Sequence, residues 1–297
     1  RRREGHRDPP RYYLTGSSRS DLDQRVKESL AGRAHLFTLH GLSMAEIRRA
    51  DPKIKLPAIL FRGALPQLYA QPELSPRRYL SDYLLSFVEK DVARGSGIEK
   101  IPEFQTVLRL SAAHTAQFLN FADIGAQSGV DQKTVAHWVE ILSRNLILET
   151  VPVFATNLSK RVVKMKKLYF HDTGLSACLM GFQDPISLWN APQLGALFES
   201  LVFSELSKTK DNFLLNWEIF TWRTKDQAEI DFVLRSGQRF ALIEAKLAIH
   251  GAKPFELDRE AKKVFSSSTL RVVVTAQGDT YRLGSETWSV PVDRLGT

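Results

Sequence analysis

Two runs near the C-terminus, Ala228–Leu234 and Phe240–Lys246, alternate apolar and charged side chains in the manner of β-strands. Period two places Asp231 on one face of the first strand, and Glu244 and Lys246 on one face of the second. A Ser-Gly-Gln sequence between the runs favours a short hairpin turn. We therefore expect Asp231, Glu244 and Lys246 to converge on one site.

These charged side chains predict metal-dependent phosphodiester hydrolysis. A charged pair on a buried strand is costly without a partner or a metal ion. Carboxylate oxygens bind Mg²⁺ or Mn²⁺, and a cation orients the attacking water. We assign Asp231 and Glu244 as metal ligands and Lys246 as the water-orienting cation. Glu199, on a preceding helix, would assist through a second metal ion or a bound water. The alternative is an inert cluster of buried ion pairs.

The segment Phe121–Leu142 has the layout of a helix-turn-helix. Gly129 is expected in a left-handed turn, and Asp131 is expected to cap the second helix. Lys133 and His137 would then lie on its exposed face as DNA-reading residues. Otherwise they are ordinary surface residues.

Residues 151–170 alternate like a β-hairpin that would form the wing of a winged helix. Five cations fall within eight positions of this hairpin, and such a cluster suits contact with DNA phosphates. They are Lys160, Arg161, Lys164, Lys166 and Lys167. The alternative is a structural spacer or a protein-docking module with solvated lysines.

The other elements follow from apolar periodicity. The pattern predicts two short strands and one helix in residues 1–42, and helices in residues 43–110. A helical stripe of Tyr79, Tyr83, Leu84 and Phe87, with Val88 and Val92 beside it, is expected in the core. Toward the C-terminus we expect helices at Phe198–Leu206 and Leu257–Phe265. We expect strands at Phe213–Trp222, residues 229–234, residues 240–246 and Leu270–Thr275.

Composition limits the setting and the partners. The 297 residues carry a formal net charge of +8, which makes DNA a plausible anionic partner. The single cysteine, Cys178, permits no intrachain disulfide and favours a cytoplasmic location. No apolar run approaches the roughly 20 residues of a membrane-spanning helix, so no membrane association is expected.

The chain resembles the prokaryotic AAA-type ATPases whose C-terminal domain of unknown function is related to PD-(D/E)xK nucleases. The matching motifs occur almost in order across residues 12 to 246. They are Tyr13–Ser17, Ser29–Arg33, Gly63–Pro66, Asn157–Arg161, Tyr169–Leu175, Phe198–Glu199, Trp222–Thr224, Glu229–Asp231 and Ile243–Lys246.

The resemblance implies that Thr15 and Ser17 lie near a nucleotide γ-phosphate, and that Arg33 is an arginine finger acting between subunits of a homo-oligomer. The alternative for Arg33 is a cation at a helix C-terminus. Such ATPases begin with a phosphate loop of the form G-x-x-x-x-G-K-[ST], and no such sequence occurs here. The chain opens on Arg1, and its first methionine is Met44. We therefore expect part of a longer protein, in which ATP is a cofactor of the full-length parent alone.

Two further departures concern single motifs. Ala64 stands where relatives tend to have a second glycine, and Leu247-Ala248 follows the Glu-x-Lys motif where many active nucleases place a polar residue. The second departure favours the inert alternative.

The sequence thus predicts an α/β protein with four parts. They are a remnant of an AAA-type ATPase core (1–42), a helical lid or linker (43–103), a winged helix (104–170) and a restriction-endonuclease-like αβββαβ domain (171–297). The leading function is the C-terminal portion of a DNA-associated ATPase with a nuclease-like domain. The alternative is a non-catalytic DNA- or protein-binding module with a degenerate nuclease fold.

Overall fold

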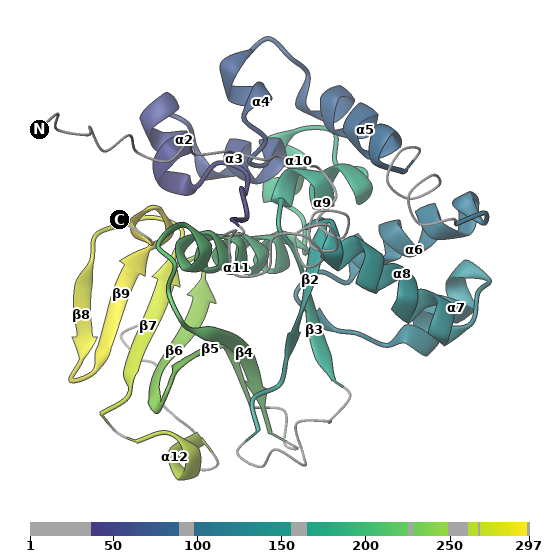
Figure 1. Ribbon diagram of the computed structural model, residues 1–297. Coiled ribbons are helices and arrows are strands. Elements are labelled where there is room, and N and C mark those ends of the chain that lie inside the picture. The colour runs from purple at the N-terminus through teal and green to yellow at the C-terminus, as the bar shows by residue number, and fades with distance from the viewer. Residues whose placement is uncertain are drawn as a thin grey trace, which may run out of the picture. The chain divides into compact units, whose positions relative to one another are not determined.

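The computed structural model describes residues 37–88, 98–155, 165–224, 228–248, 261–266 and 268–295. These residues form a mixed α/β structure with one three-stranded and one six-stranded sheet (Figure 1). The expected α/β class is confirmed. Thr15, Ser17 and Arg33, with the strand and helix expected around them, lie outside the described residues.

The first described helices are α2 (Met44–Ala50), α3 (Leu56–Arg62), α4 (Gln67–Ala70) and α5 (Pro76–Phe87). On α5, the buried residues Leu80, Leu84 and Phe87 follow the helical period, whereas Tyr83 is 37% exposed. The expectation of a buried Tyr83 was therefore wrong. Residues 37–39 form no strand, contrary to the short strand expected at residues 35–39, whose first two residues lie outside the described part of the chain.

Two helices with a tight turn between them lie in the segment for which a helix-turn-helix was expected. Gly129 has the left-handed backbone (φ 75°, ψ 21°), and the Asp131 carboxylate accepts hydrogen bonds from the N–H groups of Lys133 and Thr134. Strand β3 lies between β1 and β2 and is antiparallel to both. The elements of this region are α6 (Ile101–Ala113), β1 (Gln117–Phe118), α7 (Phe121–Ser128), α8 (Gln132–Arg144), β2 (Leu148–Pro152) and β3 (Lys166–Phe170).

The C-terminal part has the element order helix, three strands, helix, strand that was expected. Its six-stranded sheet has the strand order β4-β5-β6-β7-β9-β8, with β4, β5 and β6 antiparallel and β7 parallel to β6. Its elements, after α9 (Thr173–Leu179) and α10 (Pro185–Trp189), are α11 (Leu194–Asn212), β4 (Glu218–Arg223), β5 (Glu229–Ser236), β6 (Arg239–Lys246), α12 (Ala261–Val264), β7 (Leu270–Thr275), β8 (Tyr281–Gly284) and β9 (Thr287–Pro291), followed by the 3-10 helix η3 (Val292–Arg294).

Strand β4 begins later than expected, at Glu218 instead of Phe213. Helix α11 continues to Asn212, and Leu214 then takes a left-handed backbone conformation (φ 53°), so these residues turn the chain and do not extend it. Strands β8 and β9 had no counterpart in the sequence prediction.

Both faces of β5 and β6 are covered by apolar side chains. Phe232 and Ile243 share one core cluster with Phe198 and Val202 of α11. Val233 and Leu242 share another with Phe265, which follows α12. The predicted division of β5 into one charged and one apolar face therefore applies only near its beginning, at Glu229 and Asp231.

The two sheets meet where β2 ends. Val153 forms a parallel bridge with Thr221 of β4, and the N–H of Phe154 donates to the Thr221 carbonyl at 2.7 Å. Strand β2 consequently lies beside β4, and its partner β3 packs against α11 (Figure 1). Side chains of β3 are thereby brought toward β5 and α11.

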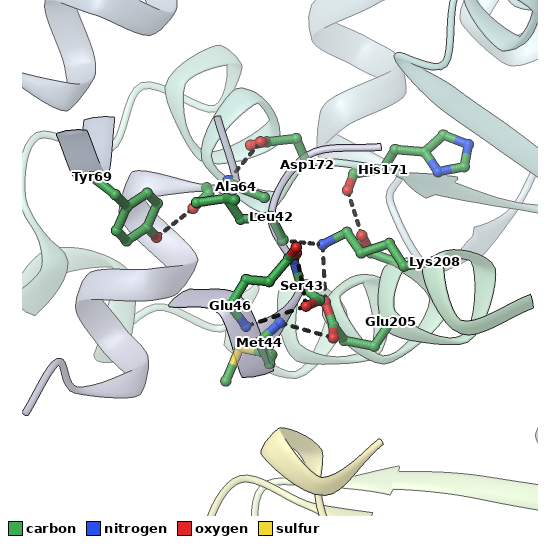
Figure 2. Close-up of polar contacts among 12 residues, drawn as sticks. Leu42, Ser43, Met44, Glu46, Ala64, Tyr69, His171, Asp172, Glu205 and Lys208 are labelled. Atoms are coloured by element: carbon green, nitrogen blue, oxygen red, sulfur yellow. Dashed lines mark hydrogen bonds and ion pairs between the residues drawn. The ribbon is translucent and has the colours of Figure 1, made fainter. Parts of the chain in front are cut away.

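A buried polar network fixes the segment before α2 onto α11 (Figure 2). The Lys208 ammonium donates to the Leu42 carbonyl at 2.8 Å and to the Glu205 carboxylate at 2.9 Å. The other Glu205 oxygen accepts the N–H of Met44 at 2.9 Å. Both buried charges of this network, Glu205 and Lys208, therefore have partners. Helix α11 thus packs against the larger sheet and also binds the segment before α2.

Replacing Gly63 by alanine should lower the free energy of unfolding by about 1–3 kcal/mol. Gly63 has a positive φ of 75°, and a Cβ there would lie 2.1 Å from Oδ1 of the buried Asp172. Chemical denaturation of Gly63→Ala measures the change. Gly195→Ala on α11 is the matched control, because a Cβ there meets nothing within 4 Å and alanine favours helix. Equal stability of the two variants would contradict the prediction.

Candidate functional site

Asp231 and Glu244 lie on neighbouring strands, as expected. Ser236 pairs with Arg239 across a two-residue turn in which Gly237 has a φ of 62°. This hairpin register brings Asp231 beside the end of β6, where Oδ2 of Asp231 accepts the N–H of Ala245 at 2.8 Å. The backbone of β6 thus orients the Asp231 carboxylate.

Lys246 forms an ion pair with Glu244, with 2.8 Å between Nζ and Oε2. The Lys246 side chain is 54% exposed, while that of Glu244 is only 12% exposed. Burial, reinforced by the Asp231 charge, raises the pKa of Glu244 to about 7. Burial also raises the pKa of Asp231. Two desolvated carboxylates therefore act on each other beside a lysine that reaches solvent.

Glu199 comes to the same region from the first turns of α11. Its Oε1 accepts a hydrogen bond from the Tyr169 hydroxyl at 2.6 Å and lies 2.7 Å from the Lys167 ammonium. Burial, followed by the charge of Asp231, raises the pKa of Glu199 to about 7. Glu199 therefore belongs to the same electrostatic cluster as Asp231, although its Oε1 is already bound by β3.

The expectation that Lys167 contacts phosphate from an exposed wing needs correction. Its side chain is 5% exposed, and its ammonium pairs with Glu199 at 2.7 Å and with Glu229 at 2.5 Å. Burial alone would lower the pKa of Lys167, but Glu199, Glu229 and Asp231 together raise it. The physical reason is the packing of β3 against α11, which turns this side chain toward Glu199 and Glu229.

Tyr169 was not predicted as a site residue from the sequence, and Glu229 was given no role. The signal that could have found Tyr169 is its spacing of two from Lys167, which puts both side chains on one face of a strand. Glu229 likewise stands two positions before Asp231. We name these seven residues the charged cluster: Lys167, Tyr169, Glu199, Glu229, Asp231, Glu244 and Lys246.

The charged cluster holds more negative than positive charge. The charged cluster contains four carboxylates and two ammonium groups. Full ionisation would therefore leave two excess negative charges in a largely buried site, and one divalent cation would neutralise them. Within the described residues, no group of three or more His, Cys, Asp or Glu side chains is arranged to hold a metal ion. Two carboxylates completed by water would suffice for Mg²⁺, which keeps several of its waters when protein-bound.

The other predicted site residues lie apart from this cluster. Lys133 and His137 are exposed on α8, and Lys166 is exposed at the start of β3. Lys160, Arg161 and Lys164 lie outside the described residues. In the described part of the chain, no helix is long and apolar enough to cross a membrane.

Two family models match the chain. Residues 54–185 match a domain of unknown function, DUF8612, and residues 194–295 match a second domain of unknown function, DUF4143. Lys167 and Tyr169 fall in the first segment, whereas the carboxylates fall in the second. The charged cluster is therefore assembled from both matched segments.

Two relatives are uncharacterized proteins, one from Mycobacterium bovis and one from Mycobacterium tuberculosis. Each is 27% identical to this chain over 234 residues, which is 78% of this chain and 51% of the relative. The chain thus spans about half the length of the curated relatives it matches. No solved structure matches the chain.

The pKa values of Glu199 and Glu244 predict that stability falls as pH rises, when divalent cations are removed. Both groups have an ordinary pKa of 4.5 and a folded pKa of about 7. The folded state therefore binds more protons, and the free energy of unfolding should drop between about pH 4.5 and pH 7, by on the order of 2–3 kcal/mol per group.

Denaturation titrations across this pH range measure the drop. Glu199→Gln and Glu244→Gln should each flatten the profile, because the neutral amide has no proton to lose. Glu73→Gln, at an exposed position, is the matched control and should leave the profile unchanged. A native profile that is flat or rises with pH over this interval would contradict the assignment.

Proposed function

We propose that this chain is the C-terminal portion of a DNA-associated AAA-type ATPase, and that its nuclease-like domain cleaves phosphodiester bonds with Mg²⁺ or Mn²⁺. The observation that carries the proposal is the meeting of two desolvated carboxylates, Asp231 and Glu244, beside the solvent-reaching Lys246. The order α11-β4-β5-β6-α12-β7 supports a nuclease-like core. The ordered motif resemblance supports the same fold.

Each residue has a part in the proposed chemistry. Asp231, oriented by the N–H of Ala245, and Glu244 would hold the cation, whose chemistry is to polarise the phosphate and lower the pKa of a bound water. Lys246 is close enough to Glu244 to share the site and exposed enough to meet a substrate. Its ammonium would orient the attacking water. Glu199, held by Tyr169 and Lys167, would contribute charge and not direct ligation.

The DNA contacts are proposed for a winged helix formed by α6, β1, α7, α8, β2 and β3. The exposed positions of Lys133 and His137 on α8 and of Lys166 on β3 support this interpretation. The hairpin residues Lys160, Arg161 and Lys164 would extend the same basic surface.

ATP binding and oligomerisation are proposed only for a longer parent protein. This chain contains no G-x-x-x-x-G-K-[ST] sequence, so we propose no ATPase activity for the chain by itself. A homo-oligomer would form through the ATPase core of that parent, in a cytoplasmic setting.

A non-catalytic binding module is the second candidate function. Lys167 and Lys246 pair with three of the four carboxylates, and the described residues contain no ready-made group of three metal ligands. An inert nuclease-like fold that grips DNA or a protein partner would show this pattern of ion pairs.

Cleavage of DNA in the presence of Mn²⁺ or Mg²⁺ distinguishes the two candidates. Asp231→Asn and Lys246→Ala should each reduce the rate by at least about 100-fold, because each removes a group that acts in the transition state. Asp279→Asn, at an exposed position of the same domain, is the matched control. Activity that survives both substitutions would refute the assigned site, and absence of cleavage by the native chain would favour the binding module.

DNA binding through the proposed winged helix should weaken steeply as salt rises. Lys166→Ala, at the exposed start of β3, should weaken binding about equally for all sequences and lower the salt slope by about one, since one phosphate contact is lost. Fluorescence anisotropy over a range of salt concentrations measures both quantities. Lys53→Ala, at an exposed position before α3, should behave like the native chain. Binding that ignores salt would instead indicate a protein-docking role.

A further inference from the structure

The charged cluster has two halves with different cations. Lys167 lies between Glu199 and Glu229, at 2.7 Å and 2.5 Å from their oxygens. In the other half, the Lys246 ammonium lies 2.8 Å from Oε2 of Glu244, and the Asp231 carboxylate is close enough to act on Glu244. Each half thus contains two carboxylates and one ammonium.

The first ammonium is enclosed, whereas the second reaches solvent. Lys167 is 5% exposed, and the rings of Phe118 and Tyr169 each lie 5.9 Å from its Nζ. The Tyr169 hydroxyl binds the same oxygen of Glu199 that Lys167 approaches. Lys246 is 54% exposed, so its side chain can move into water at little cost. Lys167 has no comparable route out.

We propose that Lys167 is a fixed cation that occupies the Glu199 and Glu229 half, so that the site takes one divalent metal ion, at Asp231 and Glu244. This inference rests on the proposed function, which places the metal ion there. Lys167 is in this account a positioning residue, because it acts through the two carboxylates it holds.

Charge balance supports a single ion. With four carboxylates and two ammonium groups, one divalent cation makes the charged cluster neutral, while two would leave two positive charges in a mostly buried site. A two-metal site also needs carboxylates that can reach ions about 3.5–4 Å apart. The carboxylates that would hold the second ion are bound to Lys167.

Calorimetric titration of the full chain with Mn²⁺ tests the number of ions. The native chain should bind one Mn²⁺, and Lys167→Met should bind two, because Glu199 and Glu229 become available. Lys262→Met, an exposed lysine of α12, is the matched control and should bind one. Two ions on the native chain, or one ion on a folded Lys167→Met variant, would overturn the inference while leaving the proposed metal site intact. No binding by the native chain would overturn both.

A second pair of variants covers the case in which Lys167→Met does not fold. Glu199→Gln keeps the side-chain shape, so Mn²⁺ affinity should fall by less than about tenfold, since a nearby charge is lost but no ligand. Glu244→Gln should lower it by more than about 100-fold, because a ligand is lost. An equal loss in both variants would show that Glu199 binds the metal and would overturn the role assigned to Lys167.

Discussion

The ion pairs of Lys167 with Glu199 and Glu229 are the contacts on which the arrangement of the charged cluster depends. They join β3 to α11 and to β5, three elements that the chain reaches at widely separated positions. A lysine buried here without carboxylates would be strongly destabilising, and the carboxylates without the lysine would face each other uncompensated. The site and the docking of β3 are therefore mutually dependent.

This dependence has a consequence for the two matched segments. The carboxylates lie within residues 194–295, but the cation that balances two of them comes from residues 54–185. The polar network of Glu205 and Lys208 adds a second buried connection, from α11 to the segment before α2 (Figure 2). Helix α11 thus carries Glu199 toward the charged cluster and also anchors the helical part.

Local pattern predicted the parts of this structure that local interactions determine. The alternation around Asp231 and Glu244 and the short turn between their strands gave the β5–β6 hairpin, and Gly129 marked the turn between α7 and α8. Lys167 could not be placed, because its partner Glu229 is 62 positions away and a row of lysines looks the same whether solvated or buried. Tyr83 was wrongly predicted to be buried for a similar reason. The helical period shows which residues share one face of α5, but tertiary packing decides how much of that face is buried.

A crystal structure of the chain soaked with Mn²⁺, with anomalous scattering to locate the metal, tests most directly whether Lys167 excludes a second ion. We expect one anomalous peak in contact with the Asp231 and Glu244 carboxylates, with the Lys167 ammonium still bound to Glu199 and Glu229. A peak bound by Glu199 or Glu229 with Lys167 displaced would contradict it. So would a site without a peak in which Lys246 binds both Asp231 and Glu244.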